Sequence, residues 1–439
     1  LVGLGDVYKR QGEDVSLSGG WVADNDYDIN IYERETTVTF NKAFDDKQIS
    51  RSLTFYPNKY IIDINVDLSE IQRWVSQGVS TLSWPGGLPL TEPNKNDEQI
   101  YYQAMVFQGD ETYAPKPQKP AQAKLERMDY PTDWIATRTK YFITALVPQK
   151  QAPGSQVLAI QENDDIRYDV GLYFDVSRPF LSTLYIGPLE YNRIKQLGKN
   201  VDRIMNFGWA FIRPISKIVH WFLIFLYKYI PIFGFVLIVF SLLVKILVYP
   251  LTAKSYTSTK KMQAIQPMLN DLREKHKNDQ RKFAQAQMAL FKEHGVNPLS
   301  GCIPILLQMP LLFALFTVFR SSIELRGEPF IFWISDLSRP DAVFDLGINI
   351  PLYGDQVAIL PILMGITMFI QMKATPTPQA GAQQKYMMYF MNAFFVLIFN
   401  QFPSGLVLYY TLFNILTILQ QKYLTPQSSL EGVVKKNSD

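Results

Sequence analysis

Two hydrophobic patterns divide the chain near residue 200. From Glu33 onward, apolar and polar residues alternate with a period of two in stretches such as SLTFYPNKYIIDINVDL and WIATRTKYFITALVP. These stretches are rich in Val, Ile, Thr, Tyr and Phe, and they are separated by Gly, Pro, Asn and Asp. Many short strands without an intervening helical pattern are typical of an all-β sandwich of antiparallel strands. We therefore predict such a domain over residues 1–202.

Residues 203–231 change to a helical pattern. Their polar residues are spaced so that they share one helical face: Asn206, Arg213, Lys217, His220 and Lys228. The other positions are mostly apolar or aromatic, which is typical of a helix that lies flat in the membrane interface. We predict an amphipathic interfacial helix here. The alternative is that this segment itself crosses the membrane.

The run IFGFVLIVFSLLVKILVYPL, residues 232–251, is a predicted membrane span. It has about 20 residues, the number that a helix needs to cross roughly 30 Å of hydrocarbon. Lys245 lies inside this run, and Ser241 precedes it by about one helical turn. A charge inside a membrane helix is costly, and Lys245 is therefore a candidate functional residue.

The remainder of the chain predicts a cytoplasmic hairpin and four more spans. The hairpin, residues 253–298, holds nine Lys and Arg residues against four Asp and Glu residues, which indicates the cytoplasmic side of a membrane. The apolar segments that follow are 302–319, 357–372, 386–402 and 404–419. Alternation of spans and loop charge predicts a five-span helical core over residues 232–424. The β domain would then lie outside, and the tail, residues 425–439, inside.

The four later spans are short, about 16 to 18 residues against the usual 20. They also carry polar side chains, which indicates a bundle that thins the bilayer or holds water. With Lys245 and Ser241, the polar residues that we predict to line a groove are Gln308, Tyr409, Tyr410, Asn414 and Thr417.

Composition argues against several other classes of function. A net charge of +3 is too small to indicate nucleic-acid recognition, and the single cysteine, Cys302, rules out an intramolecular disulfide. The three histidines lack metal-ligand spacing, and no Walker loop, HExxH or nucleophile-elbow motif is present. We therefore predict no enzyme, no cofactor and no metal site.

Lys245 has three possible roles on sequence alone. It could extend its amine to the headgroups near the cytoplasmic end of its span. It could instead be a binding charge in a polar groove formed with Gln308 and the final span, where low dielectric strengthens attraction to acidic segments. Finally, Ser241 and Lys245 at i and i+4 resemble a serine–lysine dyad, although no loop stands out that could supply an oxyanion hole.

Several long motifs resemble one known family. VKILVYPLT (244–252), VNPLSGCIPILLQMP (296–310), LPILMGITMFIQ (360–371) and FPSGLVLYYTLFNILTILQQ (402–421) closely resemble the YidC membrane-protein insertases of the YidC/Oxa/Alb family. WIATRTKYFITALVP and STLYIGP resemble the large periplasmic domain of its Gram-negative members, which implies a β-supersandwich. The order of flat helix, span, cytoplasmic hairpin and four spans also fits.

This resemblance implies an insertase and chaperone that works through a hydrophilic groove, with a positive residue on the first core span as the contact for substrate. That residue falls on Lys245, where many relatives have arginine, and the neighbouring contacts fall on Ser241, Gln308 and Tyr410. The implied partners are nascent membrane proteins, the Sec translocon, the ribosome through the hairpin or tail, and the phospholipid bilayer. The implied location is the bacterial inner membrane, with the β domain periplasmic and the C-terminus cytoplasmic.

Two expectations accompany the resemblance. Family members carry a further N-terminal span, which is missing from this sequence. A channel or secondary transporter would also place polar residues in short spans, but it would often show internal repeats, and we find no repeat here.

Overall fold

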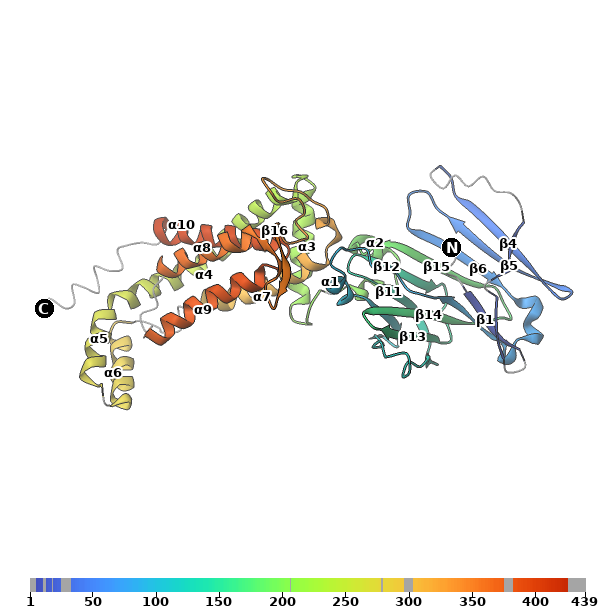
Figure 1. Cartoon of the computed structure of the whole chain (residues 1–439), viewed down its shortest axis with the longest axis horizontal. Helices are drawn as coiled ribbons and strands as arrows, with labels where there is room; N and C mark the ends of the chain where they lie inside the picture. Colours follow the sequence, from blue (N-terminus) through green and yellow to red (C-terminus); the bar gives the residue numbers. More distant parts are fainter. Residues whose placement is uncertain are drawn as a thin grey trace. The chain divides into compact units, whose positions relative to one another are not determined.

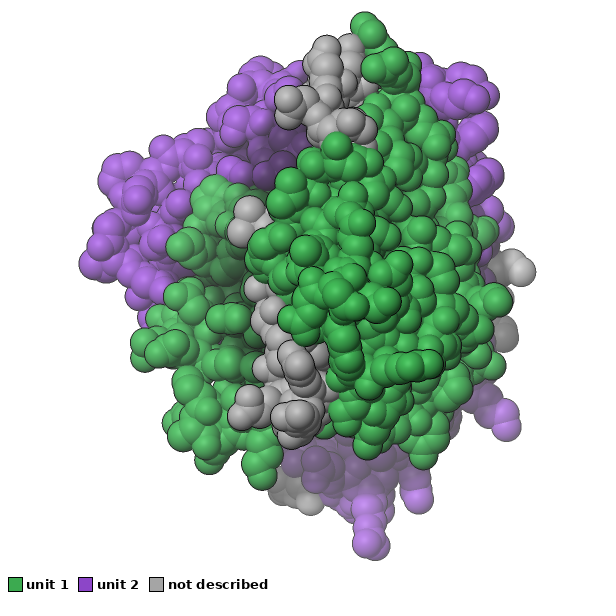
Figure 2. All heavy atoms as spheres, turned by 90° about the vertical axis from the view of Figure 1, so that its right-hand side faces the viewer, with its two compact units in different colours: residues 1–206 green, residues 207–439 purple. Residues whose placement is uncertain are grey.

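The computed structural model describes residues 5–10, 13–17, 19–24, 33–205, 207–277, 279–295, 303–374 and 382–424. The chain forms two compact units, Leu1–Asn206 and Phe207–Asp439, which Figure 2 colours separately. The first unit is built mainly of β-sheets and the second mainly of helices (Figure 1). Each unit buries a hydrophobic core of its own.

The first unit contains two antiparallel sheets. A nine-stranded sheet has the order β3-β4-β5-β6-β15-β12-β11-β8-β9. Its strands are β3 (Val22–Ala23), β4 (Thr36–Phe44), β5 (Lys47–Phe55), β6 (Ile61–Asp67), β8 (Gln103–Gln108), β9 (Glu111–Tyr113), β11 (Thr132–Arg138), β12 (Phe142–Pro148) and β15 (Phe180–Pro188). A six-stranded sheet has the order β10-β13-β14-β7-β1-β2. Its strands are β1 (Gly5–Arg10), β2 (Glu13–Ser16), β7 (Val79–Trp84), β10 (Glu126–Met128), β13 (Ser155–Glu162) and β14 (Asp165–Asp175). The predicted antiparallel all-β domain is confirmed.

The core of the first unit follows from the period-two alternation. Val106, Ile135, Leu146 and Leu184 lie opposite one another on four neighbouring strands, and all four are buried. Successive side chains of a strand point to opposite faces, so alternating apolar positions form one continuous inner face. Buried residues of the smaller sheet, including Leu172 on β14, belong to the same core.

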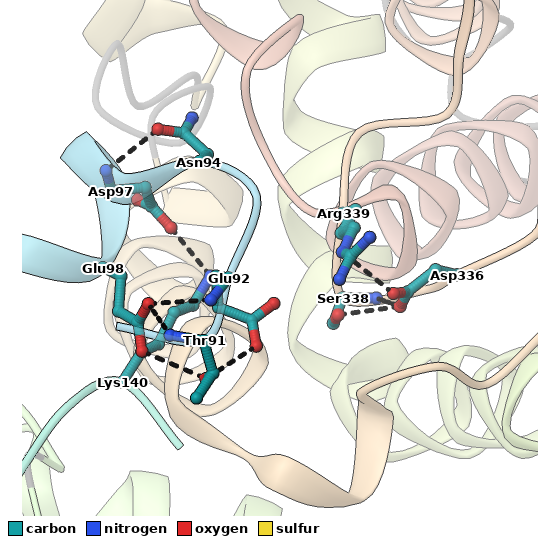
Figure 3. A network of polar contacts seen from close by, with 9 residues as sticks. All are labelled: Thr91, Glu92, Asn94, Asp97, Glu98, Lys140, Asp336, Ser338 and Arg339. Carbon is teal, nitrogen blue, oxygen red and sulfur yellow. Dashed lines mark hydrogen bonds and ion pairs between the residues drawn. The ribbon is translucent and has the colours of Figure 1, made fainter. Parts of the chain in front are cut away.

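Buried charges in this unit have partners inside the unit. Glu98, on helix α1 (Lys95–Gln99), accepts hydrogen bonds from the backbone N–H groups of Thr91 and Glu92 at 2.7 and 2.8 Å. Lys140 donates to Asp97 on the same helix at 2.7 Å (Figure 3). These contacts fix the loop before α1 and the turn between β11 and β12.

The second unit is a helical bundle with a small hairpin. Its helices are α3 (Arg213–Tyr227), α4 (Phe233–Ala264), α5 (Gln266–Lys275), α6 (Gln280–Glu293), α7 (Ile303–Ser321), α8 (Ile359–Ala374), α9 (Ala382–Phe399) and α10 (Ser404–Leu419). Strands β16 (Ala342–Ile350) and β17 (Gly354–Ala358) pair between α7 and α8. Helix α10 packs against α4, α7 and α8, and its buried residues lie in the middle of the unit's core.

Two predicted boundaries differ from the structure. The predicted interfacial segment, 203–231, contains a shorter helix, because Gly208 has a positive φ of 82° and Pro214 occupies the first turn of α3. Its exposed face is apolar and includes Ile218, Trp221 and Phe225, whereas His220 is buried. The apolar span Phe233–Ala253 agrees with the predicted run 232–251, but the predicted boundary between span and hairpin is not a helix end, because α4 continues through Pro250 to Ala264.

The number of spans stays a prediction. Within the described ranges, one helical segment, Phe233–Ala253, is long and apolar enough to cross a membrane. Ile359–Lys373 and Tyr386–Phe399 are shorter apolar helices. The predicted tail, 425–439, the end of the predicted cytoplasmic hairpin, 296–298, and Cys302 lie outside the described residues.

Candidate functional site

Lys245 is held inside the helical bundle between α4 and α10. Its side chain is buried, with 6% exposed, and its Nζ donates a hydrogen bond to Thr417 Oγ1 at 2.7 Å. The Thr417 hydroxyl in turn donates to the Phe413 carbonyl, and the Phe413 ring lies 4.5 Å from Lys245 Nζ. We call Lys245, Phe413 and Thr417 the lysine site.

The lysine site contains a cation without an anion. An ammonium group has three N–H donors, and Thr417 accepts one of them. In the part of the chain that the structure describes, no carboxylate forms an ion pair with Lys245. The burial of the amine favours a binding role over extension to the headgroups, because an extended lysine exposes its charged end. The ammonium therefore keeps donors that another acceptor can use.

A second polar cluster lies nearer the other end of α10. Tyr409 and Tyr410 are buried, and the side chain of Gln308 on α7 is the polar group beside both hydroxyls. The Tyr409 ring packs 5.8 Å from Phe240, and the Tyr410 ring packs 5.6 Å from Phe399. We call Gln308, Tyr409 and Tyr410 the tyrosine site.

The polar atoms of the tyrosine site are incompletely satisfied. Within the described residues, neither tyrosine hydroxyl nor Gln308 Nε2 has a partner in hydrogen-bonding geometry. A buried polar group without a partner costs about 1–3 kcal/mol. Three such atoms close together do not stabilise the fold, and they are well suited to hydrogen-bond with a polar segment that enters the bundle.

Two of the predicted groove residues lie apart from both sites. Ser241 is fully buried, and its hydroxyl donates to the Leu237 carbonyl of its own helix at 2.7 Å. Asn414 faces α8, where its Nδ2 donates to Thr367 Oγ1 at 3.4 Å. No hydrogen bond joins Ser241 to Lys245, so the geometry does not favour the serine–lysine dyad.

The sequence analysis missed residues that extend the lysine site along α4. The Tyr256 hydroxyl lies beside Thr417 and Gln421, and its ring lies 5.9 Å from Lys245 Nζ. Thr252 accepts a hydrogen bond from Gln420 at 3.2 Å. Ser241, Lys245, Thr252 and Tyr256 follow spacings of 4, 7 and 4, which is a helical stripe. This signal was present in the sequence, but the predicted span ended too early to reveal it.

No metal centre competes with these sites. Over the described ranges, no three His, Cys, Asp or Glu side chains lie close enough to hold an ion together. Buried His220 instead lies 3.2 Å from Glu324, in the turn after α7. The fold and its buried sites therefore define a class of protein: an antiparallel β domain followed by a membrane-type helical bundle with a buried charge.

The comparisons assign this class to a family. Residues 225–430 match the family described as 60Kd inner membrane protein, and residues 4–222 match the YidC periplasmic domain. The membrane protein insertase YidC of Chlorobium luteolum is 37% identical over 437 residues, covering 96% of this chain and 74% of the relative. That of Chlorobium limicola is 40% identical and covers 87% of this chain and 67% of the relative. The chain belongs to the YidC family of membrane protein insertases, which are inner-membrane proteins and not enzymes.

One solved structure is similar along most of the chain. It is described as an active YidC insertase crystal structure with the first transmembrane domain resolved. The similarity covers 95% of this chain and 83% of that chain, at 17% identity and a TM-score of 0.42.

Proposed function

We propose that this chain inserts nascent membrane proteins into the bacterial inner membrane, and that Lys245 is its charged contact with the incoming segment. The observation that carries the proposal is the buried ammonium of Lys245, which is bonded to a hydroxyl and has no carboxylate partner among the described residues. Charge of this kind is costly to keep inside a membrane bundle, which favours a functional reason for retaining it.

The contact would work by exchange of hydrogen-bond partners. An acidic side chain entering the bundle can accept from Lys245 Nζ in place of Thr417. A charge-assisted hydrogen bond is about twice as strong as a neutral one. No internal ion pair has to break first, so the main cost of the exchange is the desolvation of the entering carboxylate. After the substrate has left, Thr417 Oγ1 would again accept the hydrogen bond from Lys245 Nζ.

The tyrosine site would serve the uncharged polar groups of the same segment. Its two hydroxyls and the Gln308 amide can hydrogen-bond with backbone or side-chain groups that have left water. We infer that α4, α7 and α10 together line a hydrated groove. The apolar part of the substrate would then pass into lipid, and its transfer out of water would drive insertion. Ser241 on α4 and Asn414 on α10 would lie in the walls of this groove and stabilise the packing of the helices.

The charge distribution supports an orientation for the chain. The segment that contains α5 and α6 is basic, and the turn between α7 and α8 contains Glu324, Glu328, Asp336 and Asp341. By the positive-inside rule, α5 and α6 would face the cytoplasm and the β domain the periplasm. We propose the ribosome as a partner for the tail and for the hairpin, which is basic. The Sec translocon is the further partner we propose within the membrane.

A depletion rescue tests the role of Lys245. Bacteria depleted of their own insertase receive the parent, Lys245→Arg, Lys245→Ala or Lys245→Glu, and insertion of a small single-span substrate is followed. Parent and arginine variants should insert, alanine should be weak, and glutamate should fail at equal expression. The matched control is Lys373→Glu, because Lys373 is exposed on α8. Equal rescue by all Lys245 variants would exclude Lys245 as the contact.

A further inference from the structure

Apolar side chains are exposed on the hairpin that precedes α8. Five of them are between 40% and 65% exposed: Val343, Phe344, Ile348, Ile350 and Leu352. A two-stranded hairpin alone is marginally stable in water, and contiguous exposed apolar surface usually marks an interaction site. The hairpin therefore requires a covering that the chain itself does not supply among its described residues.

A neighbouring loop adds aromatic residues to this surface. Phe332 is 84% exposed although its backbone has a φ of 61°, a conformation that is costly for a bulky side chain. The Phe332 ring stacks on Trp333, and Trp333 Nε1 donates to Asp341 Oδ2 at 2.7 Å. A strained backbone that keeps the Phe332 side chain exposed is consistent with a functional role for its ring. We call the hairpin and residues 331–333 the apolar rim.

Polar side chains fix the apolar rim to the start of α8 and to the end of α9. Asp341 also accepts hydrogen bonds from the backbone N–H groups of Ile359 and Leu360, the first residues of α8. Asn400, just after α9, accepts from Ala358 N–H and donates to the carbonyls of Tyr353 and Gln356. Just upstream, Asp336 accepts from Ser338 and Arg339 and holds the loop (Figure 3). The rim is thus held level with the start of α8.

The length of α8 indicates which part of a bilayer would surround the apolar rim. Its 16 residues span about 24 Å at 1.5 Å per residue, less than the roughly 30 Å of hydrocarbon in a bilayer. Ile362 and Ile366 are exposed apolar residues of α8, and this helix begins directly after β17 of the hairpin. Because the hairpin leads directly into this short helix, its exposed apolar side chains lie where lipid is expected beyond the end of the helix.

We propose that the apolar rim lies in the boundary between headgroups and acyl chains of the leaflet nearest the start of α8. Its aromatic and branched side chains would enter the upper acyl region, as interfacial aromatic residues do. The free edges of β16 and β17 exclude a deeper position, because unpaired backbone groups are not tolerated in hydrocarbon. Exposed Asp345 and Asp355 would stay in contact with water. The rim would set the depth at which α8 sits.

Depth-dependent fluorescence quenching tests the position of the rim. Single cysteines at Ile348 or Asp355, in a Cys302→Ser background, carry an environment-sensitive dye in full-length protein reconstituted into phosphatidylethanolamine and phosphatidylglycerol vesicles. The Ile348 label should be quenched several-fold more by lipids with a nitroxide high on the acyl chain than by aqueous iodide. The Asp355 label, on the same hairpin, should show the reverse.

Other coverings give different results. Strong iodide quenching at Ile348 would show that the rim is in water, and preferential quenching by nitroxides near the chain ends would show that it is in the bilayer core. Protection that appears only with substrate, or self-quenching that rises with protein density, would indicate a protein partner or a second copy. Each of these outcomes overturns the proposal. Phe332→Cys, at a side chain with little packing, repeats the test if the Ile348 variant does not elute as folded protein.

Discussion

Lys140 in the β domain and Lys245 in the helical bundle are equally buried, each with 6% of its surface exposed. Their partners differ. Lys140 pairs with Asp97 at 2.7 Å, whereas Lys245 contacts the Thr417 hydroxyl and the Phe413 ring. Removing either partner from a paired buried charge is destabilising, but a charge without an anion is already costly. The first lysine therefore stabilises the fold, and we propose that the second is kept for a partner from outside the chain.

Arg138 shows that an arginine can also be buried without a carboxylate in a purely structural role. Its guanidinium is fully buried and donates to the carbonyls of Ile204 and Thr139 at 2.7 and 3.2 Å. Burial lowers the pKa of Arg138 to about 10, so it remains charged at neutral pH. Two backbone acceptors hold it at the end of the first unit. Lys245 has one neutral acceptor, the Thr417 hydroxyl on α10. A substrate group can replace this single acceptor more easily than the two backbone carbonyls that hold Arg138.

The largest effect on stability is expected from Asp97→Ala. The change leaves Lys140 buried without its anion, and because Asp97 is partly exposed we expect the free energy of unfolding of the β domain to fall by about 2–3 kcal/mol. Hydrogen exchange of the β11 and β12 amides measures this loss. Asp129→Ala, at an exposed carboxylate, is the matched control. An equal loss in both variants would mean that the pair is not structural.

The same pair gives a pH dependence. Burial lowers the pKa of Lys140, but Tyr141 and Asp97 outweigh burial, so the net pKa is raised above the ordinary value of 10.5. A raised pKa of a base stabilises the folded state below the unfolded value, and this stability is lost as pH rises through the folded value. The difference in stability between the parent and Asp97→Ala should therefore persist at neutral pH and shrink above pH 10.5. A constant difference would contradict this account.

A smaller effect is expected from Asp341→Ala in the bundle. Asp341 differs from Lys245 in that its Oδ2 is fully used by the protein, accepting from Trp333 and two N–H groups of α8. Loss of such a helix-capping acceptor costs about 1–2 kcal/mol. Thermal unfolding in detergent should show this loss, while exposed Asp355→Ala should not. Equal unfolding temperatures for both variants would show that the cap contributes nothing.

The smallest change in stability is expected from Lys245→Met. Replacing an unpaired buried charge by an apolar chain of similar length should leave stability within about 1 kcal/mol, shifted toward greater stability. Insertion should nevertheless be weak, as for Lys245→Ala. Lys140→Met is the contrasting variant, because it leaves Asp97 without its cation and should reduce stability without a specific loss of insertion. Destabilisation by Lys245→Met equal to that of Asp97→Ala would remove the distinction between the two lysines.

The hydrophobic pattern predicted the helices and strands better than the positions where they begin and end. The antiparallel strands and the helices around α7 to α10 follow from periodicity, although β1, β2 and β3 precede the alternation that begins at Glu33. Hairpin β16–β17 was also missed. Its pairing contains two register shifts, and the consecutive apolar residues Val343 and Phe344 break the alternation of apolar and polar positions that predicts a strand. The continuation of α4 beyond the predicted span was not predicted, because a proline in a packed membrane-type helix need not end it.

The candidate site was predictable in its residue types but not in its contacts. Lys245 stands out by its charge in an apolar run, and Phe413 could have been found four residues before Thr417. The bond between Lys245 and Thr417 joins residues that are 172 positions apart, and no local pattern encodes it. The division into a lysine site and a tyrosine site also required the packing of α10 against both α4 and α7.

A charge exchange between insertase and substrate tests the central claim most directly. A single-span substrate with one aspartate in its translocated segment, and a version with lysine at that position, are each combined with the parent and with Lys245→Glu at equal expression. The parent should insert the aspartate version better, and Lys245→Glu should fail with aspartate and regain insertion with lysine. If a folded Lys245→Glu fails with both substrates alike, Lys245 does not contact the substrate charge.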